Sequence, residues 1–101
     1  MPVAGAWTFT YTGECSEFGS GPVTMSAVTA DGLIVEGEGE VLELAATEPG
    51  VYFAEVTEEG ATSTINLQVI SPERMEGEAS FSIGTEMITC PLVIDLVSAA
   101  G

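Results

Sequence analysis

The side chains best suited to chemistry in this chain are its carboxylates and two cysteines. Sixteen aspartates and glutamates stand against one basic residue, Arg74, and the chain has no histidine and no lysine. Nucleophile–base pairs and Schiff-base chemistry therefore lack their usual groups. The carboxylates mostly alternate with apolar residues, which places them on the wet faces of strands rather than in a catalytic pair. We expect no enzymatic activity.

Metal and cofactor sites are not expected either. Zinc sites are built mainly from histidine and cysteine, and two cysteines without a histidine are too few. The sequence contains no calcium loop of the form Asp-x-Asp-x-Asp-Gly. The formal charge of −15 at pH 7 repels nucleic acid and anionic membranes, which bind through lysine and arginine. No apolar run is long enough to insert into a membrane, and the charge indicates a salty or acidic medium.

Cys15 and Cys90 are far apart in sequence but fall where a closed sheet would bring its two ends together. We predict that they form a disulfide, which indicates an oxidising compartment and a secreted or cell-surface protein. Two buried thiols that pack as small apolar residues are the alternative. The chain opens with Met1-Pro2-Val3 and lacks a signal-peptide pattern, so we expect a mature or excised chain with an added methionine.

The first and last predicted strands are the best marked. Residues 5–12 alternate aromatic residues at 7, 9 and 11 with threonines, the pattern of a strand with one buried face. A second apolar row near the C-terminus has the same period and contains Ile88, Cys90, Leu92, Ile94 and Leu96. If the strands pair antiparallel with the two cysteines opposite each other, Tyr11 lies opposite Ile94. Both apolar rows then share one face and close the sheet.

Six further strands are predicted between these two. They cover residues 23–29, 33–38, 42–46, 51–57, 65–69 and 75–83. A two-residue hairpin at Asp31-Gly32 would place Glu36 beside the inward-facing Ala27, which is unfavourable. We therefore expect a three-residue loop with Gly32 in the left-handed region, which turns Val35 and Gly37 inward.

The remaining segments read as turns, loops and a tail. Residues 13–21 are rich in glycine and serine and predict a loop, with Phe18 as a lid over one barrel end. We expect a loose tail over residues 98–101. Eight short strands with paired ends predict one all-β domain over residues 1–101. Its architecture is an eight-stranded antiparallel up-and-down barrel whose ends are joined by a Cys15–Cys90 disulfide.

A family resemblance rests on Gly5-Ala6-Trp7 at the start of the first strand. Lipocalins and their calycin relatives carry Gly-x-Trp at this position, and the meander of strands is similar to theirs, so the chain resembles this family. The resemblance implies a lipocalin-like barrel in which Trp7 closes one end beneath a basic side chain. Arg74 is the candidate for that side chain.

Two functions fit these features. The first is a secreted, non-enzymatic barrel that binds a small apolar or aromatic ligand. Its predicted lining residues are Phe9, Tyr11, Met25, Tyr52, Met75 and Phe81. These residues could equally fill the interior. The second is a structural or interaction module of an extracellular or cell-surface assembly, either monomeric or homo-oligomeric. A cavity would favour the first function, and a packed core with an exposed apolar patch the second.

Overall fold

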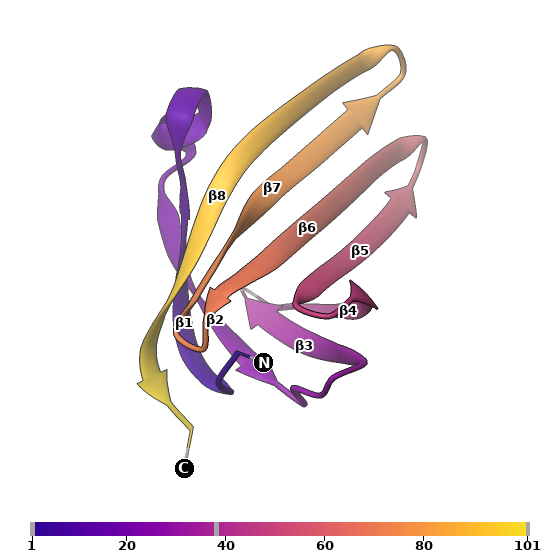
Figure 1. Cartoon of the computed structure of the whole chain (residues 1–101). Helices are drawn as coiled ribbons and strands as arrows, with labels where there is room; N and C mark the ends of the chain where they lie inside the picture. The colour runs from indigo at the N-terminus through magenta and orange to yellow at the C-terminus, as the bar shows by residue number, and fades with distance from the viewer. Residues whose placement is uncertain (1, 38, 101) are drawn as a thin grey trace.

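The computed structural model describes residues 2–37 and 39–100 and shows strands that follow one another around a closed antiparallel barrel (Figure 1). In chain order the elements are β1 (Gly5–Tyr11), the 3-10 helix η1 (Gly13–Phe18), β2 (Ser20–Ser26), β3 (Gly32–Gly37), β4 (Glu40–Glu48), β5 (Val51–Glu58), β6 (Ala61–Ser71), β7 (Arg74–Ile83) and β8 (Glu86–Ala99). The predicted fold class is confirmed. Residues 13–18, which we expected to be loop, form η1. Glu38, predicted to end the third strand, and Gly101 lie outside the described residues.

One apolar face of each strand fills the interior. In β7, for example, Met75 and Ala79 are buried while the intervening Glu76 and Glu78 are exposed. The largest fully buried side chains are Trp7, Met25, Tyr52, Leu67, Met75 and Cys90. Burial of each large apolar side chain stabilises the fold by about 1.5–3 kcal/mol. Because these residues come from different strands, the core ties the whole barrel together.

The ladder between β1 and β8 closes the barrel, in a register that differs from the predicted one. Tyr11 pairs with Leu92 instead of Ile94, a displacement of two residues. A displacement of two residues keeps every side chain on its original face, so the apolar rows still meet inside. The register was predicted wrongly because Cys15 does not belong to the ladder. The strand ends at Tyr11, and Cys15 lies on η1.

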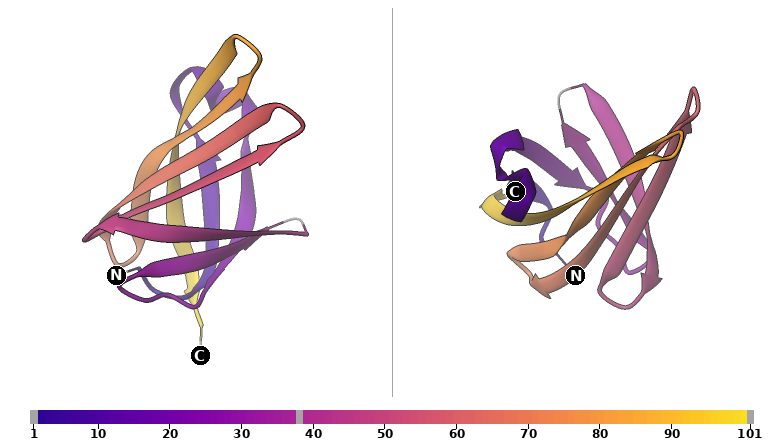
Figure 2. Two further views of the ribbon diagram at one scale, coloured as in Figure 1. Left: turned by 90° about the vertical axis from the view of Figure 1, so that its right-hand side faces the viewer. Right: turned by 90° about the horizontal axis from the view of Figure 1, so that it is seen from above.

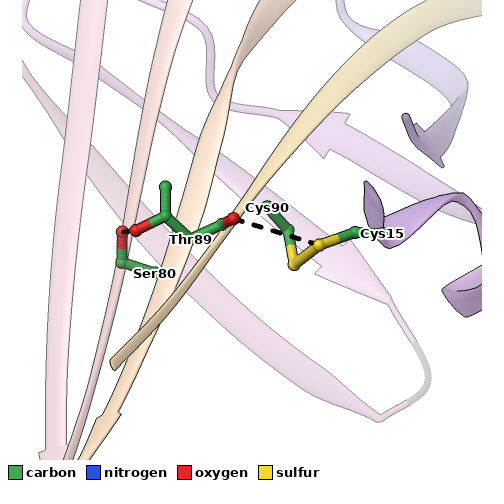
Figure 3. The surroundings of a disulfide bond; sticks show 4 residues. All are labelled: Cys15, Ser80, Thr89 and Cys90. Carbon is green, nitrogen blue, oxygen red and sulfur yellow. Dashed lines mark hydrogen bonds between the residues drawn. A yellow bond between two sulfur atoms is a disulfide. The ribbon is translucent and has the colours of Figure 1, made fainter. Parts of the chain in front are cut away.

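The helix η1 brings Cys15 to β8, where it forms the predicted disulfide with Cys90 (Figure 3). The two Cα atoms are 5.5 Å apart and both residues are buried. Before the helix, the Thr12 amide donates to the carbonyl of Pro91 at 2.9 Å, which fixes the direction of the chain. The Sγ of Cys15 lies 3.9 Å from the Thr89 carbonyl oxygen. This is a packing contact, because a disulfide sulfur carries no proton to donate.

The connection between β2 and β3 is longer than either predicted hairpin. Met25 pairs with Val35, so residues 27–31 lie outside the ladder, and Gly32 belongs to β3 rather than to a left-handed turn. Thr29 organises this loop, because its hydroxyl accepts hydrogen bonds from the amides of Asp31 and Gly32. The left-handed position is Ala27, with a φ of 50°. Val35 still packs against the core, as expected.

The C-terminal tail is ordered further than predicted. β8 continues to Ala99, with Ser98 opposite Ala6 and Ala99 opposite Gly5. The Ala100 amide then donates to the carbonyl of Ala4 at 2.9 Å. The expectation of a loose tail from Ser98 was wrong for residues 98–100, because the first residues of β1 offer an edge with which they can pair.

Both chain termini emerge at one end of the barrel, which we call the closed end (Figure 1). Trp7 lies near this end, two residues after the start of β1. The ring is 1% exposed, and its Nε1 donates to the carbonyl of Val3 at 2.8 Å. The Val3 amide in turn donates to the carbonyl of Pro72 in the β6–β7 turn at 3.0 Å. The N-terminal segment is thereby held across this end by the indole and the turn together.

Replacing both cysteines, Cys15→Ser with Cys90→Ser, is expected to lower the free energy of unfolding by about 4 kcal/mol, because the loop that they close is long. Chemical denaturation followed by circular dichroism measures the change. Wild-type protein under a reductant serves as the control and should be destabilised similarly. An unchanged midpoint would contradict the role of the disulfide in closing the barrel.

The substitution Trp7→Ala is expected to cost about 3–5 kcal/mol, since it empties a fully buried site. Trp7→Phe should cost less, because it keeps an aromatic ring, although it loses part of the indole volume and the N–H group bonded to Val3. Denaturation curves compare the two variants. Trp7 is the single tryptophan of the chain, so emission from the wild-type protein also reports on this site. Full accessibility of that emission to acrylamide would argue against a buried indole.

Candidate functional site

The six predicted ligand-lining residues fall into two groups. Met25, Tyr52 and Met75 are at most 1% exposed and lie in the core. The Tyr52 hydroxyl donates to the carbonyl of Thr29 at 3.2 Å, so the ring is anchored by its polar end as well. These three side chains fill the interior of the barrel. Their role as ligand contacts stays a prediction.

The other three, Phe9, Tyr11 and Phe81, lie towards the end of the barrel opposite the closed end. The rings of Phe9 and Tyr11 meet edge to face with centroids 5.6 Å apart, and Phe18 of η1 continues the series at 5.8 Å from Tyr11. Phe18, predicted as a lid, is 62% exposed and lies against Tyr11. Phe81 is 41% exposed. These aromatic side chains therefore combine packing with accessible surface.

Arg74 makes ion pairs with carboxylates. Its Nε donates to Oε2 of Glu76 and its Nη1 donates to Oδ1 of Asp95, each at 3.1 Å. The hydrogen bond to Glu76 and then the charge of Asp95 raise the pKa of the guanidinium above its ordinary value. The side chain is 44% exposed and precedes the inward-facing Met75, so it lies on the outer surface. Arg74 was predicted to pack over Trp7, but its side-chain hydrogen bonds are to Glu76 and Asp95.

Four strands extend beyond the closed part of the barrel. The β1–β8 ladder ends at Tyr11 and Leu92, whereas the β7–β8 ladder continues to Ile83 and Glu86. The β5–β6 ladder continues to Glu58 opposite Ala61, and the β6–β7 ladder continues to Ala61 opposite Ile83, so both end level with the β7–β8 ladder. Figure 2 shows the β5–β6 and β7–β8 hairpins projecting on one side of the molecule. We call this end the open end.

The inner face of the projecting strands is apolar and exposed. Val56, Phe81, Ile83 and Ile88 share the face of the buried Ala54, Ala79 and Cys90, because side chains alternate along each strand. Their exposed fractions are 41% for Val56 and Phe81, 68% for Ile83 and 55% for Ile88. We call these four residues the open apolar face.

Cross-strand pairing arranges this face in two rows. The inner row runs from Val56 through Ser63 and Phe81 to Ile88. The outer row runs from Glu58 through Ala61 and Ile83 to Glu86. An apolar surface is therefore bounded at its rim by a carboxylate at each side.

Sequence reasoning predicted Phe81 as a ligand-lining residue of the interior and did not predict that Ile83 and Ile88 belong to an exposed surface. The alternation in the sequence showed which face they occupy. It did not show that β1 stops short, so that the described part of the opposite wall leaves them exposed. A usable signal was the length of the last two strands, each of which is longer than the aromatic first strand.

A gap in the pairing between β4 and β5 helps to open this end. The ladder stops at Ala45 opposite Phe53. Continued in the same register, it would set Glu43 opposite Glu55, and Glu40 opposite Glu58. Like charges directly opposite each other destabilise a ladder. The sequence thus stops the pairing of β4 with β5 just where the barrel opens.

Two open recesses lie elsewhere on the surface. One of about 390 Å³ lies where β2 diverges from β3, lined by Pro22, Val23, Thr24, Glu36, Gly37, Gly39, Glu40 and Val41. The other, about 270 Å³, lies over β6 and β7 and is lined by Asn66, Gln68, Glu76, Gly77 and Glu78. Both open widely to solvent, and the walls of the first are mainly apolar whereas those of the second are mainly polar. Neither has the enclosed form that a small apolar ligand prefers.

Residues 2–37 and 39–100 contain no group of three or more metal-ligating side chains close enough to hold an ion. In the same part of the chain no helix has the length and apolar character needed to cross a membrane. Comparison with known protein families, with curated proteins and with solved structures found no match to this chain. The class that the fold defines is a closed eight-stranded antiparallel barrel with a disulfide.

The charge at the β4–β5 gap can be tested by Glu43→Lys, which replaces repulsion from Glu55 by attraction. Pairing of β4 with β5 should then extend past Ala45, and the free energy of unfolding should rise by about 0.2–1 kcal/mol. Hydrogen exchange would slow at residues 54–58.

The control is Glu73→Lys, which makes the same change of net charge in the exposed β6–β7 turn. Stabilisation equal to that of Glu43→Lys, without slower exchange at residues 54–58, would mean that only the total charge matters.

Proposed function

We propose that this protein is a secreted or cell-surface, non-enzymatic interaction module that binds a partner through the open apolar face. The observation that carries the proposal is that Val56, Phe81, Ile83 and Ile88 lie exposed on one concave side of a single sheet. Contiguous apolar surface with a polar rim is typical of an interaction site. Scattered exposed apolar residues would carry no such weight.

The filled interior supports a surface site over a buried one. A ligand deep in the barrel would have to displace Tyr52 or Met75, which are at most 1% exposed. A small apolar ligand at the open end, between Phe81 and the ring of Tyr11, is the second candidate. The exposed aromatic edges there favour it.

Two other features support the class of protein. The Cys15–Cys90 disulfide suits an oxidising compartment, and with it a secreted or cell-surface location. The absence of histidine and lysine from the sequence leaves the open end without an imidazole base or a side-chain amine nucleophile. We also propose a relation to lipocalins, because the Gly5-Ala6-Trp7 motif lies near the closed end of a closed barrel.

Selection from a displayed library of random peptides tests the proposed surface. Peptides that bind the wild-type protein should lose about ten-fold or more in affinity on the double variant Phe81→Ser, Ile83→Ser, because contacts at the centre of an interface dominate its energy. The control is Ile70→Ser with Val97→Ser, which removes exposed apolar side chains from other surfaces. Equal binding to both variants would overturn the proposal.

Native mass spectrometry after incubation with a mixture of small apolar compounds separates the two candidates. A retained compound that is lost from the Phe81→Ser, Ile83→Ser variant would establish the small-ligand function. A bare protein mass, together with peptides that need the open apolar face, is the outcome expected here.

A further inference from the structure

The outer edge of β5 near the open end is an unused strand edge. β5 pairs with β6 along its whole length, from Val51 to Glu58, but pairs with β4 only as far as Phe53. Among the described residues, the backbone groups of residues 54–58 that face away from β6 have no strand beside them. Such an edge is a template for an added strand. Figure 2 shows β4 running away from β5 past the point where their pairing stops.

Charge decides what can pair with this edge. Its outer face carries Glu55, and its inner face carries Glu58 at the rim of the open apolar face. A neighbouring strand with glutamates at the facing positions is kept off, as β4 is with Glu43 and Glu40. A strand with lysine or arginine at those positions would be attracted instead. The edge therefore selects for a basic partner.

Val56, one of the two residues between these glutamates, sets a second requirement for a strand that pairs with this edge. Val56 lies on the inner face and is the first residue of the row that continues to Phe81 and Ile88. A residue opposite Val56 in an added strand would extend that row by one position. An apolar side chain there would bury surface on Val56, which is 41% exposed.

A second copy of this chain is a poor occupant of the edge. Each copy carries a formal charge of −15, so two copies repel over their whole surfaces. The single arginine is already bound to Glu76 and Asp95 and is not available to a partner's carboxylates. The positive charges that pair with Glu55 and Glu58 must therefore come from a different molecule.

We propose that the free edge of β5 and the adjoining part of the open apolar face together bind an extended segment of a basic partner protein, with lysine or arginine at the two positions that face Glu55 and Glu58 and an apolar residue at the position that faces Val56. The segment adds a strand beside residues 54–58, with backbone hydrogen bonds to β5, basic side chains at Glu55 and Glu58, and an apolar side chain over Val56. This inference rests on the proposed function and names the chemistry of the partner.

The test uses the full protein and two capped synthetic peptides of identical composition. One repeats Lys-Val-Val-Lys, in which the lysines are three positions apart as Glu55 and Glu58 are, and the other groups the same lysines and valines in two blocks. The spaced peptide is expected to bind the wild-type protein more tightly and to slow hydrogen exchange at residues 54–58 in NMR spectra. Its affinity should fall as salt is added, because the basic contacts are exposed.

Matched variants locate the contact. Glu55→Gln with Glu58→Gln should weaken the spaced peptide by roughly ten-fold, the loss expected for two exposed charge pairs. Glu14→Gln with Glu73→Gln changes the net charge equally at other sites and should leave the affinity nearly unchanged. Val56→Ser should weaken binding while the protein remains folded by circular dichroism, because Val56 is the apolar residue beside the added strand.

The other outcomes overturn the inference in distinguishable ways. Equal binding of both peptides, with spectral changes spread over the acidic surface, would reveal non-specific attraction. Contact with Phe81 and Ile83 without protection of residues 54–58 would refute strand addition and leave the proposed function intact. Pairing of two protein copies through the β5 edge, detected by analytical ultracentrifugation, would identify the wrong occupant. Failure of both peptides and of library selection would remove the proposed function as well.

Discussion

The antiparallel ladder between β1 and β8 is the constraint on which the barrel depends. The other ladders join strands that are neighbours in sequence and form with short loops, whereas this one joins the two ends of the chain. Once it forms, the inner faces of all the strands enclose one interior, with Trp7 and Leu96 facing each other across the closure. The disulfide also favours closure of the barrel, because it keeps the two ends of the chain near each other before the ladder forms.

The open end shows how charge limits the barrel. Strands of equal length around the circumference would have covered the inner row at Phe81 from the opposite wall. Instead β1 turns into η1 after Tyr11, and the glutamates of β4 and β5 oppose further pairing on the other side. The four longer strands are left with one apolar face towards solvent. Acidic side chains thereby border a region suited to an apolar contact.

Much of the fold could be predicted from residue alternation, because a buried face repeats every second residue whatever the rest of the chain does. The strands, the barrel and the disulfide followed from the rows that contain Trp7 and Cys90. The register of closure did not, since it depends on a 3-10 helix that places Cys15 outside the ladder. The β2–β3 loop is set by hydrogen bonds to Thr29, one of them from Tyr52 in a distant strand. The open apolar face could not be predicted, because alternation gives the direction of a side chain and not the height of the wall opposite.

The arrangement of the two chain ends also determines how the domain responds to mechanical force. Both ends leave the closed end from adjacent antiparallel strands, so tension between them separates β1 from β8 one hydrogen-bonded pair at a time, starting at Gly5 and Ala99. This unzipping stops at the Cys15–Cys90 bond, which carries the load directly from one strand to the other. Residues 16–89 lie within the covalent loop and experience no tension. Under load the extension of the domain is therefore limited by the disulfide.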